Sequence, residues 1–320
     1  MLRGDPREWL APPAGSAVTI GVYDGVHRGH QEVIGRLRER AAVRGVASGL
    51  ITFDRHPLRV VAPQRAPQLL TTLEQRLELL EGLGLELVAV LPFDERMREL
   101  GPEAFVSLVL DEGVDARLVL VGEDFRFGKH RAGDVDALAE LGKAHGFEVE
   151  AVPLLEAGET PLSSTAIRQA VAAGRVEEAA RVLGRCHEVR GEVVAGSGRG
   201  RELGFPTANL MPSPEVVVPG RGIYAGRVEV GRDEHLAAAS VGVRPTFGEE
   251  ERVVVEAYLL DFEGDLYGRQ IDLRLCWRLR DEERFESVDE LVAQMHRDVK
   301  AVREASHPPN PPPSSGGGRP

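Results

Sequence analysis

Cysteine is scarce in this sequence, which holds only Cys186 and Cys276 among its 320 residues. The two lie far apart along the chain and lack the close spacing of metal ligands. The sequence therefore predicts neither a disulfide framework nor a cysteine zinc site. We expect both side chains to be reduced, inert thiols.

A long hydrophobic run and a basic leader are also missing. No apolar run approaches the roughly 18 residues that a membrane helix needs. The amino end, MLRGDPREWL, does not join a basic segment to an apolar one. These features predict a cytoplasmic protein without a membrane partner.

Positive charge is in deficit. The chain has 39 lysine and arginine residues against 51 aspartate and glutamate residues, a formal net charge of −12. Such a balance disfavours non-specific binding to nucleic acid or to an anionic membrane, so we expect no nucleic-acid partner. An anionic ligand must therefore be held by a local site.

Length and composition indicate a folded protein of more than one domain. The 320 residues exceed the usual domain size of about 100–200. The hydrophobic fraction of 42% and the charged fraction of 28% lie close to globular averages. Two domains, each with its own core, are the expectation.

The first half of the chain alternates β-rich runs with helical patterns, which is typical of βαβ units and a parallel sheet. The expected strands are 18–23, 47–53, 85–91, 118–121 and 148–152. In the helix between the first two, Val33, Ile34, Leu37 and Ala41 recur with helical spacing. Helical stretches at 165–173 and 176–183 close this half.

The pattern changes beyond Gly184. From 189 to 277, apolar and polar residues alternate between Gly, Pro and Asp clusters, which favours antiparallel strands in a small barrel or sandwich. An amphipathic helix at 287–302 should pack against it. The final segment has no apolar anchor, so we expect a disordered tail. The expected domains are an α/β domain at 1–185, an antiparallel β domain at 186–305 and the tail at 306–320.

The strongest local motif is TIGVYDGVHRGHQEVI at 19–34. His27 and His30 are three residues apart and share a face in a first helical turn, where backbone N–H groups form a natural phosphate site. Two surface histidines in a flexible turn are the alternative for this spacing alone. The combination of strand, glycine-rich turn, paired histidines and helix favours nucleotide binding.

Two other predicted strands also end in polar side chains. ITFDRHPL at 51–58 carries Asp54 and His56 to the edge where parallel sheets bind ligands. VGEDFRFGKHRAGD at 121–134 does the same and adds Asp124, Arg126, Lys129 and Arg131. A merely solvated loop remains the alternative for Lys129 and His130.

PLSSTAIRQA at 161–170 supplies a second anion-binding pattern. Ser163, Ser164 and Thr165 stand at a helix start, with Arg168 one turn on. Helix capping alone would explain the hydroxyl groups, but it would not require the arginine. Together with the strand ends, this segment favours a nucleotidyl-transfer site.

The second half carries its own candidate site in GRGRELGFPTANL at 198–210. The Thr207 hydroxyl and the Asn209 amide oxygen are hard ligands suited to magnesium held with nucleotide phosphates. Turn formation is their alternative role. Glu256 stands in an otherwise apolar strand, where a carboxylate needs a partner or a purpose, or else faces the surface.

The motifs GVYDGVHRGHQ, TFDRHP, GEDFRFGKHRAGD, SSTAIR, GFPTANL, VRPTF and VEAYLLDFEGDLYG occur here in one order. The same motifs occur in this order in the bacterial bifunctional riboflavin kinase and FAD synthetase family, which the chain resembles from about residue 18 to residue 300. The resemblance implies a Rossmann-like nucleotidyltransferase domain, for FMN adenylylation, followed by an antiparallel β-barrel riboflavin-kinase domain.

The resemblance also implies substrates and a metal. The kinase would make FMN and ADP from riboflavin and ATP, and the adenylyltransferase would join FMN to a second ATP, giving FAD and pyrophosphate. Both steps would use Mg²⁺. A homo-oligomer is left open.

By the same resemblance, Glu256 is the catalytic base of the kinase, and His27 and His30 are catalytic in the adenylyltransferase. The implied ATP-binding residues of the adenylyltransferase are Gly21, Tyr23, Asp24, Gly25, His27, His30, Ser164, Thr165 and Arg168. The implied flavin-binding or phosphate-binding residues are His56, Asp124 and Arg126. ATP and magnesium binding in the kinase falls to Gly198, Gly200, Thr207 and Asn209, with the last two as metal ligands.

A few residues depart from the family pattern. Tyr23 stands where Phe is usual, Arg55 where Pro is usual, and Ala166 where Arg is frequent. None of these changes removes a mapped phosphate or magnesium group, although they bear on adenylylation. A single-activity nucleotidyltransferase would leave the second half unexplained. A non-catalytic flavin carrier would not need His27, His30 and Glu256.

Overall fold

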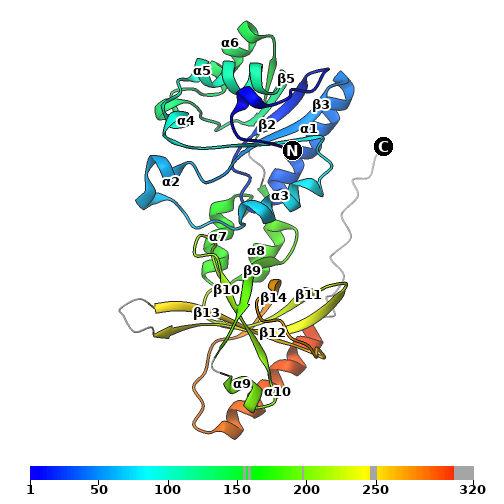
Figure 1. Cartoon of the computed structure of the whole chain (residues 1–320), viewed down its shortest axis with the longest axis vertical. Coiled ribbons are helices and arrows are strands. Elements are labelled where there is room, and N and C mark those ends of the chain that lie inside the picture. Colours follow the sequence, from blue (N-terminus) through cyan, green and yellow to red (C-terminus); the bar gives the residue numbers. More distant parts are fainter. Residues whose placement is uncertain (154–155, 158–159, 197, 246–250, 306–320) are drawn as a thin grey trace. The chain divides into compact units, whose positions relative to one another are not determined.

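The computed structural model describes residues 1–153, 156–157, 160–196, 198–245 and 251–305 (Figure 1). The chain divides into two compact units, Met1–Ala166 and a second that begins at Ile167. The domain limits expected from the sequence, at residues 185 and 305, stay predictions. The tail expected at 306–320 lies outside the described residues.

The first unit is built on a six-stranded parallel sheet with the strand order β1-β4-β3-β2-β5-β6. The strands are β1 (Leu2–Arg3), β2 (Ser16–Ile20), β3 (Ala47–Phe53), β4 (Leu87–Leu91), β5 (Ala116–Gly122) and β6 (Glu148–Val152). The order reverses between β2 and β5, and sheets of this class bind ligands outside the carboxyl ends of the strands at such a point. A short antiparallel pair, β7 (Glu156–Ala157) and β8 (Thr160–Pro161), follows the sheet.

Helices connect these strands. They are α1 (Arg28–Arg44), α2 (Leu58–Val61), α3 (Leu73–Glu81), α4 (Glu95–Glu99), α5 (Pro102–Phe105), the π-helix η3 (Val106–Gly113) and α6 (Val135–His145), with 3₁₀ turns η1 (Pro6–Glu8), η2 (Pro63–Arg65) and η4 (Lys129–Arg131). A capping box between Thr72 and Gln75 starts α3. Gly45, at φ 67°, ends α1 in the left-handed conformation that glycine adopts without strain.

The sheet is buried on both faces. Successive strand residues point to opposite faces, and each face packs in its own hydrophobic cluster. Ile51 packs in one cluster with Val106 and Val109 of η3. Its neighbour Leu50 packs in another cluster with Ile34 of α1 and Leu80 of α3. The expected α/β half is confirmed, while the sequence analysis missed β1 and η3.

The second unit contains a closed antiparallel barrel with the strand order β10-β13-β12-β11-β14-β9. Its strands are β9 (His187–Val194), β10 (Thr207–Pro212), β11 (Gly222–Val230), β12 (Asp233–Pro245), β13 (Glu251–Leu259) and β14 (Gln270–Arg280). The helix α7 (Ser164–Ala172) crosses the boundary between the units, and α8 (Val176–Leu183), α9 (Arg199–Glu202) and α10 (Val288–Ala305) belong to the second. The prediction of a β-barrel is confirmed.

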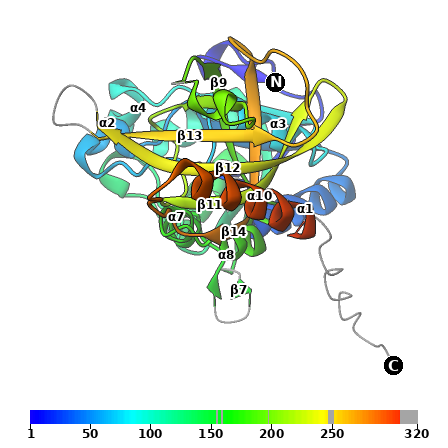
Figure 2. The same ribbon diagram turned by 90° about the horizontal axis from the view of Figure 1, so that it is seen from below.

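Alternation along β13 separates the barrel core from the candidate site. Val255, Ala257 and Leu259 are buried in the barrel, so Glu256 and Tyr258 lie on the other side of the strand. The amphipathic helix α10 packs outside the barrel against β11, β12 and β14 (Figure 2).

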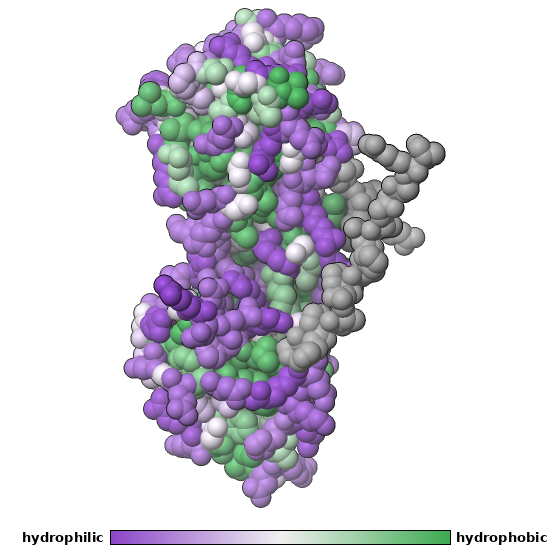
Figure 3. Space-filling model, turned by 90° about the vertical axis from the view of Figure 1, so that its right-hand side faces the viewer, coloured by the Kyte–Doolittle hydropathy of each residue, from purple (hydrophilic) through white to green (hydrophobic). Residues whose placement is uncertain are grey.

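The surface carries no sign of a bilayer span in the part that the structure describes. Among those residues, no helix combines the length and the apolar composition that crossing a membrane requires. On the face drawn in Figure 3, hydrophilic residues surround smaller hydrophobic patches.

The two cysteines correct the sequence analysis, because Cys186 and Cys276 form a disulfide. Strands β9 and β14 are antiparallel and pair so that His187 lies opposite Leu275, which brings Cys186, just before β9, close to Cys276 on β14. The Cα atoms of the cysteines are 4.8 Å apart, within the range that a disulfide spans. The prediction of inert thiols was wrong because it judged proximity by distance along the chain.

We expect the Cys186→Ser/Cys276→Ser double variant to lose about 2–4 kcal/mol in the free energy of unfolding of the second unit, since the bridge closes a long loop in the unfolded chain. Denaturant unfolding of both proteins, with and without a thiol reductant, measures this loss. Reductant should destabilise the native protein and leave the variant unchanged. A native protein insensitive to reductant would contradict the assignment of a stabilising bridge.

Candidate active sites

The turn between β2 and α1 holds its backbone in a strained conformation. Tyr23 has φ 52° and Val26 has φ 40°, values that residues other than glycine rarely adopt and that are least favourable for bulky or β-branched side chains. Buried Asp24 fixes the turn, because its carboxylate accepts hydrogen bonds from Leu70 N at 2.9 Å and from Thr71 N at 3.2 Å. The Gly25 N–H donates to the Thr71 hydroxyl at 3.3 Å. Asp24 therefore shapes the turn through its contacts with residues 70–71.

His27 and His30 stack at the start of α1, with ring centroids 3.6 Å apart. His27 caps the helix, since its Nδ1 accepts a hydrogen bond from His30 N at 3.4 Å. Burial, reinforced by the neighbouring His27, holds the pKa of His30 well below 6.5. His30 Nδ1 is buried and finds no hydrogen-bond partner among the described residues. His30 thus offers a neutral imidazole, stacked on His27, beside the N–H groups of a helix start, and these groups together suit an anion.

The amino end of α7 joins this turn. The Ser164 hydroxyl donates to Asp24 O at 2.9 Å, while Ser163 Oγ accepts from Ala166 N and caps the helix. Thr165 and Arg168 follow on α7, and Arg168 lies beyond the end of the first unit.

A cavity of about 600 Å³, which we call the aromatic cavity, opens beyond the carboxyl ends of β2 and β3. Five aromatic rings line it: Phe53, Phe93, Phe105, Phe125 and Phe127. Its basic groups are Arg98, Arg126, Lys129 and Arg131, with His56 beside them. The candidates Gly21, His56, Arg126, Lys129 and Arg131 from the sequence analysis lie in its wall, whereas Asp124 is exposed and is not among the lining residues. The rings were missed because phenylalanines at strand ends look like core residues in a sequence.

In the barrel, the register of two strands brings the predicted kinase residues together. Asn209 on β10 lies directly opposite Glu256 on β13, and Ser240 on β12 lies on the other side of Glu256. Thr207 precedes Asn209 by two residues and shares its face of β10. The carboxylate, the amide and the hydroxyl therefore stand on one surface of the barrel.

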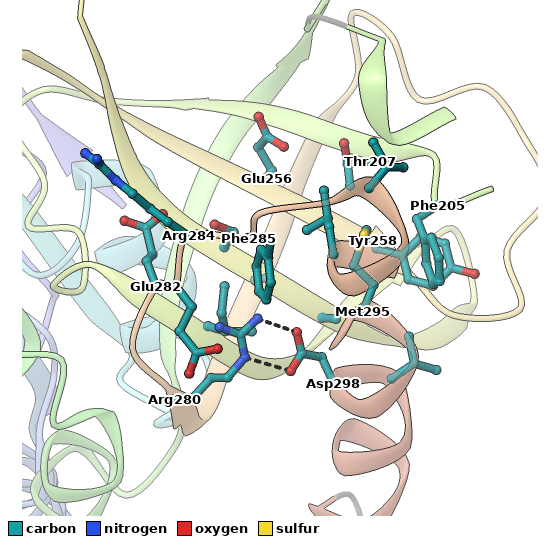
Figure 4. Close-up of a pocket in the computed structure, with 18 of the residues that line it drawn as sticks. Phe205, Thr207, Glu256, Tyr258, Arg280, Glu282, Arg284, Phe285, Met295 and Asp298 are labelled. Atoms are coloured by element: carbon teal, nitrogen blue, oxygen red, sulfur yellow. Dashed lines mark hydrogen bonds and ion pairs between the residues drawn. The ribbon is translucent and has the colours of Figure 1, made fainter. Parts of the chain in front are cut away.

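Two cavities meet at this surface. The first, about 610 Å³, is lined by Phe205, Ile223, Tyr258, Phe285 and Val299 among others, and we call it the apolar cavity (Figure 4). The second, about 630 Å³, is lined by Gly196, Gly198, Gly200, Arg201, Pro206, Asn209 and Tyr267, and we call it the glycine-rich cavity. Four residues line both: Thr207, Glu256, Leu291 and Met295. The two cavities therefore adjoin at these four residues, where a group bound in one cavity would lie close to a group bound in the other.

Two glycines are required where the loop of the glycine-rich cavity approaches β10. A Cβ atom at Gly196 would lie 2.2 Å from Asn209 Nδ2, and one at Gly200 would lie 2.5 Å from Phe205 O. Asn209 Oδ1 is buried and accepts no hydrogen bond from the described residues. This hard oxygen, together with the Thr207 hydroxyl, fits a magnesium ion.

An ion pair fastens α10 to the barrel at the edge of the apolar cavity. Arg280 Nε donates to Asp298 Oδ1 at 2.9 Å, and Arg280 Nη2 donates to Asp298 Oδ2 at 2.7 Å (Figure 4). Gln294 Nε2 also donates to Asp298 Oδ1, at 2.8 Å. The bonds with Asp298 raise the pKa of Arg280, whose guanidinium lies 6.0 Å from the centre of the Phe285 ring. The sequence analysis missed this pair, since its partners stand on different elements.

Comparison with known proteins covers both units. A family model described as FAD synthetase matches residues 11–166, and one described as riboflavin kinase matches residues 183–306. The crystal structure of a macrolide-efflux protein from Streptococcus pneumoniae is similar with a TM-score of 0.86 and 30% identity, over 95% of this chain and 99% of that one. That name describes the other protein, and what the likeness shows here is a common fold.

Curated relatives match over nearly their whole length. The bifunctional riboflavin kinase/FMN adenylyltransferase of Pseudomonas fluorescens is 38% identical over 294 residues, 92% of this chain and 94% of the relative. The protein of the same name from Escherichia coli (strain K12) is 38% identical over 305 residues, 95% of this chain and 97% of the relative. The one from Bacillus subtilis (strain 168) is 34% identical over 300 residues, 92% and 94% of the two chains.

We expect His30→Ala to slow adenylylation of FMN by about 10²–10³, because removing one preorganised donor from developing phosphate charge typically costs that much. Phosphorylation of riboflavin by the same preparation should continue at its normal rate. Separate assays with FMN and with riboflavin make the comparison. Unchanged FAD formation would remove His30 from the site.

Asp298→Asn should raise the KM for riboflavin by about tenfold, since it leaves Arg280 without its charged partner and loosens α10 at the cavity wall. Asp261→Asn is the matched control, because it breaks an exposed ion pair between the same helix and Asp261. Steady-state kinetics should show a normal KM for the control. Equal kinetics in the two variants would mean that the buried pair does not shape the cavity.

Proposed function

The chain belongs to the bifunctional riboflavin kinase/FMN adenylyltransferase family, and on this premise we propose how its two sites divide the two reactions. It phosphorylates riboflavin to FMN and adenylylates FMN to FAD. The kinase reaction belongs to the barrel and the adenylyl transfer to the parallel sheet. ATP is the proposed co-substrate of both reactions, and the cytoplasm remains the proposed compartment.

The wall shared by the two barrel cavities is the observation that carries the kinase assignment. The apolar cavity suits the flat ring system of riboflavin, and the glycine-rich cavity lets backbone approach a triphosphate. Glu256 stands between them and takes the proton from the riboflavin 5′-hydroxyl. The hydroxyl oxygen then bonds to the γ-phosphorus, the bond from that phosphorus to the bridging oxygen breaks, and ADP leaves.

Magnesium is the proposed metal of the kinase site. Thr207 Oγ1 and Asn209 Oδ1 would hold it, in keeping with the unpartnered amide oxygen described above. A bound Mg²⁺ would supply positive charge for the phosphates of ATP. Gly198 and Gly200 would let the loop lie close to those phosphates.

The adenylyltransferase needs no base of this kind. The phosphate of FMN is already anionic and attacks the α-phosphorus of ATP directly, and pyrophosphate leaves as the new phosphate–phosphate bond forms. His27, His30 and the N–H groups at the start of α1 would hold the ATP phosphates, with the backbone from Gly21 to Gly25 close by.

The remaining predicted residues take supporting roles. Ser164, Thr165 and Arg168 are proposed to clamp the same nucleotide. The aromatic cavity would take the flavin ring, and His56 and Arg126 in its wall would meet the phosphate of FMN. Asp124 is kept as a binding residue on the resemblance alone.

We expect Glu256→Gln to slow riboflavin phosphorylation by about 10²–10⁴, because the amide keeps the size of the carboxylate but cannot accept the proton. Adenylylation of supplied FMN should proceed at the normal rate. Assays with riboflavin and with FMN, each with ATP and Mg²⁺, test both statements.

Glu192→Gln is the control, since Glu192 is an exposed carboxylate on β9 and lines neither barrel cavity. The control should retain both activities. An equal loss of both reactions in Glu256→Gln would show that Glu256 is structural or that the two sites are coupled. Normal phosphorylation in that variant would exclude it as the base.

A further inference from the structure

Arg76 of α3 is a buried cation with no part in the chemistry described so far. The residue is only 2% exposed, the largest of the fully buried side chains. Both of its hydrogen bonds go to main-chain carbonyl groups, from Nη1 to Val22 O at 2.8 Å and from Nη2 to Phe53 O at 2.5 Å. Its Nε is buried without a partner among the described residues. Burying a charged side chain costs free energy of folding, so the contacts of the Arg76 guanidinium group indicate what it contributes here.

The two carbonyl groups lie at functional positions. Phe53 is the last residue of β3, and Val22 follows β2 and precedes the strained turn at Tyr23. Both residues line the aromatic cavity. Val22 O accepts a second hydrogen bond, from the Thr52 hydroxyl at 3.1 Å. One guanidinium group therefore ties together the carboxyl ends of two neighbouring strands where they form the cavity wall.

The turn is held from two directions by one stretch of chain. Asp24 is bonded to the backbone of Leu70 and Thr71, just before α3 begins, and Arg76 reaches back from the first turns of α3 to Val22. The capping box of Thr72 and Gln75 fixes the start of that helix. Residues 70–76 thus fix the backbone on both sides of Tyr23.

Nearby carboxylates stabilise the positive charge of Arg76 in its buried position. Asp24 and Asp54 are the main charges that favour the protonated guanidinium, against a burial that lowers the pKa of Arg76. Both carboxylates accept hydrogen bonds from backbone N–H groups, at Leu70 and at Phe93 respectively. In a buried setting, where water screens poorly, such a cation acts over a longer range than one at the surface.

We propose that Arg76 is a positioning residue for adenylyl transfer: it fixes the carbonyl groups of Val22 and Phe53 and so aims the turn at 23–26 at the phosphates of ATP. This inference rests on the proposed function of the first site. Arg76 acts through the backbone and does not touch the substrate. Its loss misplaces the phosphate-binding turn, and a displacement of about 1 Å can cost about 10² in rate.

The test compares three variants of the full chain. Arg76→Met removes the charge and both donors, and Arg76→Lys keeps the charge but cannot bond to two carbonyl groups at once. Leu118→Ala is the control for lost stability, because Leu118 on β5 is buried in a cluster that contains no residue of the turn at 21–26, so truncating it destabilises the unit away from that turn. The readouts are KM for ATP and kcat in FMN adenylylation, riboflavin phosphorylation, and the thermal midpoint.

We expect Arg76→Met to lower kcat/KM for adenylylation by about 10², with a raised KM for ATP and unchanged phosphorylation. Arg76→Lys should retain the native thermal midpoint and raise the KM for ATP by about tenfold. Leu118→Ala should melt earlier but keep the native KM for ATP at temperatures below its thermal midpoint.

A native KM in Arg76→Lys, or the same kinetics in Arg76→Met and Leu118→Ala, would overturn the inference and leave Arg76 a structural residue. If Arg76→Met does not fold, the lysine variant alone decides. A native chain that does not adenylylate FMN at all would instead contradict the proposed function of this site.

Discussion

Buried side chains that hydrogen-bond to the backbone at strand ends hold the first site in place. A phosphate site built from main-chain N–H groups works only if the backbone keeps its conformation, and Tyr23 and Val26 hold conformations that are unfavourable alone. Asp24 and Arg76 offset that cost with five hydrogen bonds to four main-chain groups. The supported turn leads directly into His27 and α1, and both carbonyl groups that Arg76 bonds belong to residues of the aromatic cavity wall.

The barrel has a different task from the parallel sheet. A riboflavin kinase must hold a neutral flavin and an anionic nucleotide next to each other. Its closed sheet leaves Glu256 and Asn209 on adjacent strands with a register that cannot slip without exposing the core residues beside them. Aromatic and aliphatic side chains line much of one cavity, and glycine backbone bounds part of the other, so the two cavities offer different groups to a ligand. The helix α10 contributes Leu291 and Met295 to both cavities, and its attachment through Asp298 therefore bears on each.

Sequence alone was sufficient for features that depend on local pattern. The alternation of strands and helices predicted the parallel sheet, the two-residue periodicity predicted the barrel, and family motifs indicated His27, His30 and Glu256. Features that depend on register or on contacts between distant segments could not be read in this way. The disulfide required the pairing of β9 with β14, and the ion pair of Arg280 required the packing of α10 on β14.

The phenylalanines of the aromatic cavity were missed for another reason. An apolar residue at a strand end has the same pattern whether it fills the core or lines a cavity, and only the space left around it decides. Arg76 was hidden by a similar ambiguity, because an arginine on an amphipathic helix is normally solvated. Its burial follows from the strand ends that it bonds, which lie 54 and 23 residues away in the chain.

The central claim is that one chain carries out two successive reactions on a flavin. The most direct measurement is a time course in which the pure protein receives riboflavin, ATP and Mg²⁺ and the flavins are separated and quantified. The account predicts that FMN accumulates first and that FAD follows, with ADP formed in the first step and pyrophosphate in the second. Riboflavin left unchanged, or FMN that never becomes FAD in the presence of excess ATP, would contradict it.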